Sequence, residues 1–194
     1  MEPVRAFIAI ELPEPIKAAL SQLEDALKKG KSASVKWVDP GSIHLTLKFL
    51  GNVDAGEIPE LTKVLSEAVR GVAPFNLELA NPGAFPGIQS PKVVWVGVAG
   101  EMEPLHTLHK NIERALVPLG FSPENRAFSP HLTLGRVREE SSFTERRNLG
   151  EAIAALKVGE KPSFKVRGVN LMRSRLTREG AIYSCLASLA FEDI

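Results

Sequence analysis

Two stretches of the chain carry the same four residues, "HLTL", which begin at His44 and again at His131, although the chain holds only four histidines. A histidine can accept or donate a proton near neutral pH, and a threonine hydroxyl can donate a hydrogen bond to an anionic oxygen. Two imidazoles suit an in-line displacement at phosphorus, in which one activates the nucleophile and the other protonates the leaving oxygen. The repeat therefore predicts a catalytic pair, His44 and His131, assisted by Thr46 and Thr133.

If each tetrapeptide lies in a β-strand, its side chains alternate between the two faces of a sheet. His44 and Thr46 then share one face, while Leu45 and Leu47 share the other, which suits a core. The same alternation holds for the second copy. We therefore expect the two polar faces to meet across a cleft, with all four leucines buried.

The elements that position these strands follow from hydrophobic periodicity and from the placement of glycine and proline. Helical spacing of apolar residues predicts helices at Pro15–Lys29, Glu57–Val69, Met102–Leu116 and Thr144–Leu156. Strand patterns occur at Arg5–Leu12, Phe75–Leu79, Lys92–Ala99, Ser129–Val137, Ser163–Val166, Val169–Arg173 and Ala181–Phe191. The segment Asn81–Pro91, rich in glycine and proline, is predicted to be a loop. This mixture indicates an α+β fold.

The order of these elements predicts an internal repeat. The motif histidines are 87 positions apart (131 − 44), and the same shift places Glu57, which starts a helix, on Thr144, which starts another. The order strand, helix, motif strand, helix and strand thus occurs twice. We expect a single domain over residues 1–194, built from two intertwined, pseudo-symmetric lobes with the site in the cleft between them.

Composition excludes several classes of function. The net charge is +1, so no global field directs the chain to nucleic acid or membranes, and any anion site has to be local. Cys185 is the only cysteine, which excludes an internal disulfide and suits the reducing cytoplasm. The apolar run near the N-terminus, about eight residues long, is too short for a signal sequence or a membrane span. We expect a cytoplasmic monomer with no membrane partner.

Metal-dependent and ATP-dependent chemistries lack their motifs. Zinc enzymes generally use three protein ligands, but no acidic residue adjoins either motif histidine, and His106 and His109 lie on a predicted helix. The chain has no G-x-x-x-x-G-K-[ST] loop and no G-x-S-x-G turn. We therefore expect neither a metal ion nor a cofactor in the site.

Nearly the whole chain resembles a known family, through the stretches "RAFIAIELP", "SIHLTLKFLG", "FSPHLTLGRV" and "LMRSRLTREGAIYSCL". These stretches are similar to the 2H phosphoesterase superfamily, and within it to the RNA 2′,3′-cyclic phosphodiesterases, also called the 2′-5′ RNA ligase family. The resemblance implies a bilobal α+β fold whose antiparallel sheets form a cleft. It also implies metal-independent hydrolysis of RNA 2′,3′-cyclic phosphate ends to 2′-phosphates, with His44 as proton donor and His131 as proton acceptor.

Two alternative functions stay open. The same histidines could join a 5′-hydroxyl RNA end to a 2′,3′-cyclic phosphate end, which is a 2′-5′ RNA ligase activity. A non-catalytic module could bind nucleotide or RNA without turnover, although binding alone would not need two intact histidines. In each case the expected partner is an RNA or nucleotide with a 2′,3′-cyclic phosphate end.

Four further residues are candidate substrate ligands. Lys48 continues the polar face of the first motif by alternation, and Arg126 and Ser129 lie in the loop before the second motif. Phe7 could stack on a base.

The residues that follow the second motif have different expected positions. Alternation places Arg136 on the leucine face, which argues against a contact with substrate. Gly135 takes the position of Lys48, where it is expected to leave the wall of the cleft open.

Overall fold

The computed structural model describes residues 3–30, 34–159, 161–177 and 180–192, which form a mixed α/β fold. In chain order the elements are β1 (Val4–Glu11), α1 (Glu14–Lys28), β2 (Val35–Trp37), η1 (Pro40–Ser42), β3 (His44–Val53), η2 (Ala55–Glu57), α2 (Ile58–Ala68), β4 (Phe75–Phe85), β5 (Val93–Gly100), α3 (Met102–Leu116), η3 (Val117–Leu119), β6 (His131–Val137), α4 (Phe143–Ala155), β7 (Ser163–Val166), β8 (Gly168–Leu176) and β9 (Ala181–Ala190). The expected α+β class is confirmed.

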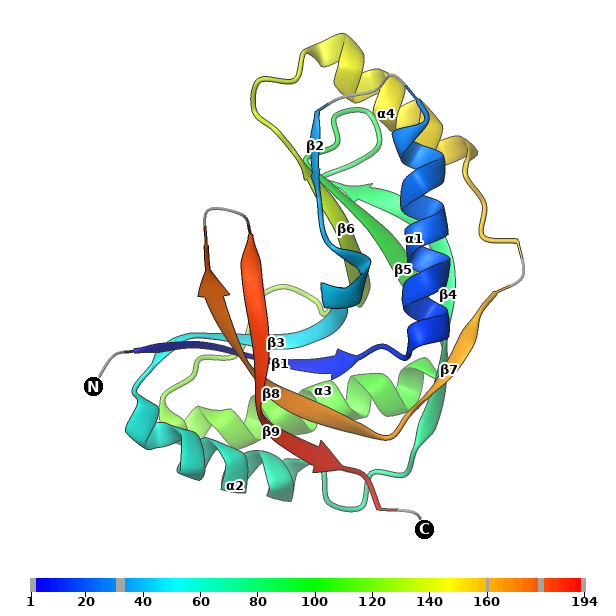
Figure 1. Ribbon diagram of the computed structural model, residues 1–194. Helices are drawn as coiled ribbons and strands as arrows, with labels where there is room; N and C mark the ends of the chain where they lie inside the picture. The colour runs from blue at the N-terminus through cyan, green and yellow to red at the C-terminus, as the bar shows by residue number, and fades with distance from the viewer. Residues whose placement is uncertain (1–2, 31–33, 160, 178–179, 193–194) are drawn as a thin grey trace.

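The strands form two antiparallel sheets. The first has the order β3-β1-β8-β9, and the second has the order β2-β6-β5-β4-β7. The two motif strands therefore belong to different sheets, yet β3 and β6 contact each other. Figure 1 shows the sheets as two layers that open away from this contact, with the β8–β9 hairpin rising beside the gap.

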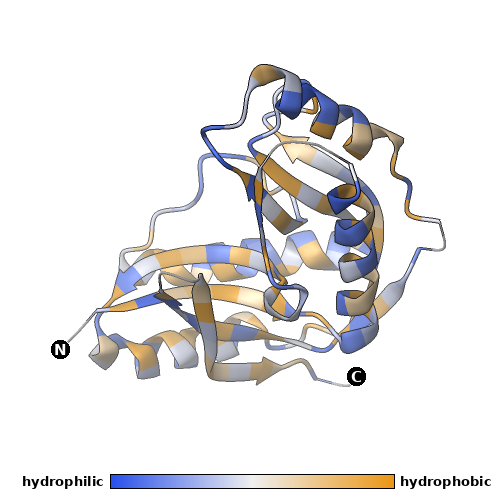
Figure 2. Cartoon of the chain, turned by 45° about the horizontal axis from the view of Figure 1, so that its top comes forward, coloured by the Kyte–Doolittle hydropathy of each residue, from blue (hydrophilic) through white to orange (hydrophobic). Residues whose placement is uncertain are grey.

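Two of the helices, α1 and α3, lie against the sheet to which the strand before them does not belong. Helix α1 follows β1 of the first sheet but runs beside β4 and β5 of the second, while α3 follows β5 but lies below the first sheet and contacts β3 (Figure 1). Each amphipathic helix buries its apolar face. In α3 the buried residues are Leu105, Leu108, Ile112 and Leu116. Polar and apolar segments alternate along the strands and helices in Figure 2, and one continuous core joins both sheets.

Strand β4 is longer than expected, because Asn81–Phe85 continues it where the sequence predicted a loop. This part pairs with β5 beyond an irregularity between Leu79 and Pro82 that accommodates the proline. Gly83 is required there, since a Cβ atom at this position would lie 2.4 Å from the ring of Trp95. The short strand β2, which pairs with β6, was not predicted either.

Each motif strand contains a β-bulge directly after its threonine. In β3, Leu47 has no partner in the pairing with β1, and in β6, Leu134 has none in the pairing with β5. An extra residue reverses the alternation of all side chains that follow it. As a result, two successive residues in each strand, Leu47–Lys48 and Leu134–Gly135, are buried.

We expect Gly135→Ala to lower the free energy of unfolding by about 1–3 kcal/mol, because the site has no room for a methyl group. A Cβ atom there would lie 2.7 Å from Cγ1 of Val35 and 3.1 Å from the carbonyl oxygen of Lys36. Urea unfolding followed by circular dichroism measures the change. Gly159→Ala is the matched control, since nothing lies within 4 Å of the added methyl group. Equal effects of the two substitutions would contradict this packing account.

Candidate active site

The histidines and threonines of the repeated tetrapeptides line a single cleft of about 660 Å³, which we call the motif cleft. β3 supplies His44 and Thr46, and β6 supplies His131 and Thr133. The four leucines of the tetrapeptides are at most 3% exposed and lie on the other face of each sheet. The alternation expected from the sequence therefore holds within each tetrapeptide and ends at the bulge.

A main-chain carbonyl orients each imidazole. Nδ1 of His44 lies 2.9 Å from the carbonyl oxygen of Ser42, and Nδ1 of His131 lies 2.7 Å from that of Ser129. A carbonyl oxygen can only accept, so the ring nitrogen carries the proton in both contacts. In the neutral rings, Nε2 then keeps a free lone pair. Each histidine has one nitrogen engaged and one available for proton transfer.

Aromatic side chains enclose the ring of His44. Phe7 stacks on it with the ring centroids 4.7 Å apart, and Tyr183 meets it edge-on at 4.9 Å. Burial lowers the pKa of His44 below the ordinary histidine value, and the Ser42 carbonyl and the Glu11 carboxylate oppose this change only in part. The free protein therefore favours the neutral ring of His44.

A different aromatic wall supports His131. Phe85 meets its ring edge-on at 4.9 Å, and Trp95 lies 6.3 Å away between the centroids. Both residues belong to the paired strands β4 and β5, so this wall depends on the part of β4 that the sequence predicted to be a loop. A strand that contains Pro82 gives no regular alternation, and Phe85 could not be recognised from the sequence as a neighbour of His131.

The expected orientation of Lys48 is wrong, because the bulge at Leu47 turns its side chain to the core face. Only 4% of the side chain is exposed, and Nζ lies within 3.0 Å of both carboxylate oxygens of Glu113 on α3. Nζ also donates to the carbonyl oxygen of Ser122 at 2.8 Å, and Glu113 accepts from the N–H of Glu124. Lys48 thus connects β3 to α3 and to the loop that leads to β6, although its residue still borders the motif cleft.

The expected orientation of Arg136 is wrong for the same reason. The bulge in β6 turns Arg136 outward, where it is exposed and lines the motif cleft. Its counterpart in β3, Phe49, is 61% exposed. Gly135 does not leave an open wall, because it is buried under Val35 and Trp37 of β2. The register of the neighbouring strand produces these reversals, and nothing in "HLTLGR" alone reveals them.

Arg126 and Ser129 both line the motif cleft, as exposed residues of the loop before β6. Ser129 also contributes the carbonyl that orients His131. Arg5, Arg126 and Arg136 give the rim of the cleft three exposed guanidinium groups, which attract an anion.

Phe7 lines the motif cleft but offers no free face to a base. Its side chain is 2% exposed, because the rings of His44, Phe49 and Tyr183 pack around it. Its position supports the imidazole of His44 instead.

The remaining two histidines pack against the loop before β6. Phe128 stacks on His109 with the centroids 4.0 Å apart and meets His106 edge-on at 6.0 Å. Within the described ranges, no group of three or more His, Cys, Asp and Glu residues could hold a metal ion. No helix of the described chain is long and apolar enough to cross a membrane.

We expect Lys48→Met to lower the free energy of unfolding by about 3–5 kcal/mol, because it leaves the carboxylate of Glu113 buried without its counter-charge. The double variant Lys48→Met, Glu113→Met should regain most of this loss, since it removes both charges. Lys161→Met is the control, because Lys161 forms an exposed pair with Glu78 at 3.4 Å, and it should change stability little. Urea unfolding compares the variants, and a single variant as stable as the unaltered protein would refute the anchoring role.

Comparison with known proteins agrees with this geometry. A family model described as the 2′-5′ RNA ligase superfamily matches residues 12–178, which include both tetrapeptides. A protein of Methanothermobacter thermautotrophicus named RNA 2′,3′-cyclic phosphodiesterase is 38% identical over 93% of this chain and 95% of its own length. A protein of the same name from Aeropyrum pernix is 35% identical over 86% of this chain and 92% of its own length.

Solved structures show the same architecture. A protein of Thermus thermophilus superimposes with a TM-score of 0.78 at 27% identity, covering 97% of this chain and 98% of that chain. E. coli LigT in complex with 3′-AMP also gives a TM-score of 0.78 at 27% identity, covering 98% of this chain and 99% of that chain. With the family match, the sequence relatives and the paired motifs in one cleft, this chain belongs to the 2′-5′ RNA ligase superfamily.

Proposed function

We propose that this protein hydrolyses the 2′,3′-cyclic phosphate at RNA ends to a 2′-phosphate without a metal ion. The observation that carries the proposal is the pair of imidazoles in the motif cleft, each with Nδ1 held by a carbonyl and Nε2 available. The relatives named RNA 2′,3′-cyclic phosphodiesterase support the choice of substrate. The three exposed arginines on the rim suit a polyanion.

In the proposed reaction, Nε2 of His131 takes a proton from water as the water oxygen attacks phosphorus. The bond from phosphorus to O3′ breaks in line with this attack, and His44 gives its proton to the departing O3′. The hydroxyls of Thr46 and Thr133 donate hydrogen bonds to the non-bridging oxygens, where negative charge develops. The product has a 2′-phosphate and a free 3′-hydroxyl, and proton exchange with solvent restores both histidines.

The assignment of His44 as the acid follows the family resemblance, and the burial of its ring affects how this acid works. A lowered pKa makes its imidazolium a stronger proton donor, although fewer rings carry a proton in the free protein. A bound cyclic phosphate places an anion near the ring and raises the protonated fraction. In the proposed reaction, the bound substrate therefore increases the share of His44 that can donate a proton.

We propose that the protein acts as a monomer in the cytoplasm. Both histidines come from one chain, so the motif cleft needs no second copy. The single cysteine, Cys185, supports a reducing compartment. Because each step is reversible, the same pair could also join a 5′-hydroxyl end to the cyclic phosphate, and assays should follow both directions.

Incubation with 2′,3′-cyclic AMP in the presence of EDTA tests the proposal directly. We expect conversion to 2′-AMP, separated from 3′-AMP by chromatography. Saturable binding without turnover would favour a nucleotide-binding module. Loss of turnover on addition of EDTA would favour metal-assisted catalysis.

His44→Ala and His131→Ala should each lower kcat by about 10²–10⁴-fold, because each removes one end of a coupled proton transfer. The double variant should be little slower than the poorer single variant, since groups that act as one unit are not additive. Thr46→Val and Thr133→Val should cost less, about 1–3 kcal/mol of activation free energy each. His106→Ala is the control outside the cleft, and turnover at the unaltered rate in both motif variants would exclude paired-histidine catalysis.

The dependence of kcat/KM on pH should be bell-shaped, with His44 required protonated and His131 required neutral. The alkaline limb reports loss of the proton from His44 in the free enzyme. Because burial lowers the pKa of His44, this limb should lie below the pH expected for an exposed histidine. In the pH profile of kcat, the alkaline limb should lie at higher pH than in the profile of kcat/KM, since bound phosphate stabilises the imidazolium of His44.

A variant can separate burial from other influences on this limb. Phe7→Leu opens space beside His44, so water should reach the ring and the alkaline limb of kcat/KM should shift upward. A profile that is flat between about pH 5 and 9, with chemistry rate-limiting, would count against two titrating imidazoles.

A further inference from the structure

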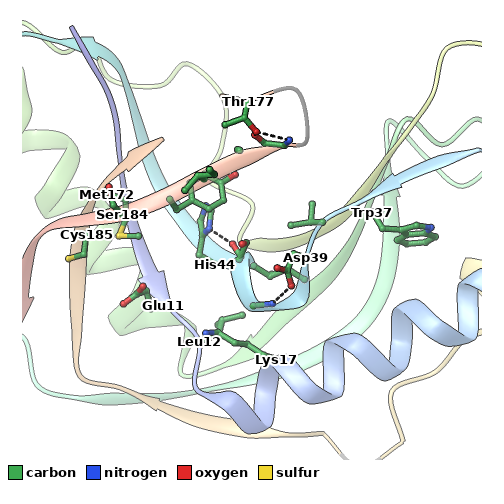
Figure 3. A pocket seen from close by; sticks show the side chains of 18 of the residues that line it. Glu11, Leu12, Lys17, Trp37, Asp39, His44, Met172, Thr177, Ser184 and Cys185 are labelled. Carbon is green, nitrogen blue, oxygen red and sulfur yellow. Dashed lines mark hydrogen bonds between the residues drawn. The ribbon is translucent and has the colours of Figure 1, made fainter. Parts of the chain in front are cut away.

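A second pocket, of about 700 Å³, adjoins the motif cleft at His44, and we call it the side pocket. His44, Arg136 and Tyr183 line both cavities, whereas His131 and Thr133 line only the motif cleft. One wall of the side pocket is formed by β2 and η1, and the other by Thr177 and residues 180–185 of the β8–β9 hairpin. Figure 3 shows His44 between these two walls.

Two basic side chains meet at the β2 side of this pocket. Lys36 of β2 lies directly opposite Arg136 of β6 in the antiparallel pairing, both are exposed, and both line the side pocket. We call them the cation pair. Like charges directly opposite each other on neighbouring strands are unfavourable. Within the described chain, neither side chain has an ion pair or a hydrogen bond that would offset the repulsion.

The other charged residues of the side pocket have partners. Glu11 accepts a hydrogen bond from the Asn170 amide, and Asp39 accepts one from a main-chain N–H two residues later. Lys17 pairs with a glutamate of its own helix. These contacts leave Glu11 and Asp39 negatively charged, whereas the two members of the cation pair have neither a hydrogen bond nor an ion pair within the described chain. An anion bound between the members of the cation pair would relieve their repulsion.

The hairpin supplies the opposite wall with apolar surface. Ile182 lines the side pocket and is 50% exposed, and Met172 and Tyr183 also line the pocket. Figure 3 shows Trp37 apart from this group, near α1, where Lys28 lies over its ring. Cations on one wall and apolar side chains on the other match the phosphate and the base of a nucleotide.

The in-line geometry of the proposed reaction determines which part of an RNA reaches this pocket. Water approaches phosphorus from the side of His131, so the leaving O3′ and its ribose lie on the side of His44. The 5′ oxygen of that ribose leads to the preceding nucleotide. The RNA chain therefore leaves the motif cleft past His44, where the side pocket begins.

We propose that the side pocket binds the nucleotide that precedes the terminal one, with the cation pair holding the internucleotide phosphate. The inference rests on the proposed function and deepens it. It makes the protein selective for RNA ends over mononucleotides. Lys36 is then a specificity-determining residue, because it lines the side pocket but not the motif cleft.

The test compares kcat/KM for 2′,3′-cyclic AMP with that for the dinucleotide ApA that ends in a 2′,3′-cyclic phosphate. Lys36→Ala should lower the dinucleotide value about two- to fivefold, through KM and not kcat, and leave the mononucleotide value unchanged. Lys36→Arg should restore the dinucleotide value. Lys165→Ala, at an exposed position of β7 on the far edge of the same sheet, is the matched control and should affect neither substrate.

A dinucleotide with a neutral methylphosphonate linkage tests the phosphate contact itself. It should lose the advantage over the mononucleotide, and Lys36→Ala should then have no further effect. Equal effects of Lys36→Ala on 2′,3′-cyclic AMP and on the ApA dinucleotide, or no effect on either, would overturn the inference. Turnover of 2′,3′-cyclic AMP would in that case still support the proposed function. An effect confined to the joining of a 5′-hydroxyl acceptor would also overturn the inference. No turnover of cyclic AMP by the unaltered protein would refute the proposed function and this inference together.

Discussion

The burial of four leucines determines the face of the sheet on which each motif histidine lies. Leu45, Leu47, Leu132 and Leu134 are at most 3% exposed, and a strand with a side-chain period of two then leaves histidine and threonine only the opposite face. A slip of one residue would expose the leucines, at about 2 kcal/mol each, and push the imidazoles into the core. Since β3 and β6 contact each other from different sheets, this requirement brings both rings to one cleft.

The crossed helices keep the two sheets at a fixed separation. α1 and α3 each follow a strand of one sheet and cover the other, and a single core runs through both. Opening the cleft widely would therefore expose apolar surface on both sides. Lys48 adds a polar link, because its buried pair with Glu113 connects a motif strand to α3 and to the loop before the second motif. The positions of the histidines are properties of the whole fold.

Local periodicity explains which parts of this structure could be predicted. Helix α3 has the bounds expected from its apolar spacing, and the polar and apolar faces of each tetrapeptide are as alternation predicts. The misplaced residues depend on pairing between distant segments. The bulges exchange the faces of Lys48 and Arg136, the end of β4 becomes a strand only against β5, and the three-residue β2 exists only against β6. No short window of sequence contains these partners.

Main-chain carbonyls make the orientation of both imidazoles independent of the side chains at positions 42 and 129. Every amino acid brings a carbonyl group, so substitutions at Ser42 and Ser129 that keep the backbone path preserve the acceptor for each Nδ1. A carboxylate side chain that orients a histidine is lost when its residue is replaced, whereas a main-chain carbonyl is present whichever amino acid occupies the position. The orientation of both rings therefore tolerates changes of side chain at positions 42 and 129, while the aromatic residues that pack against the rings stay under constraint.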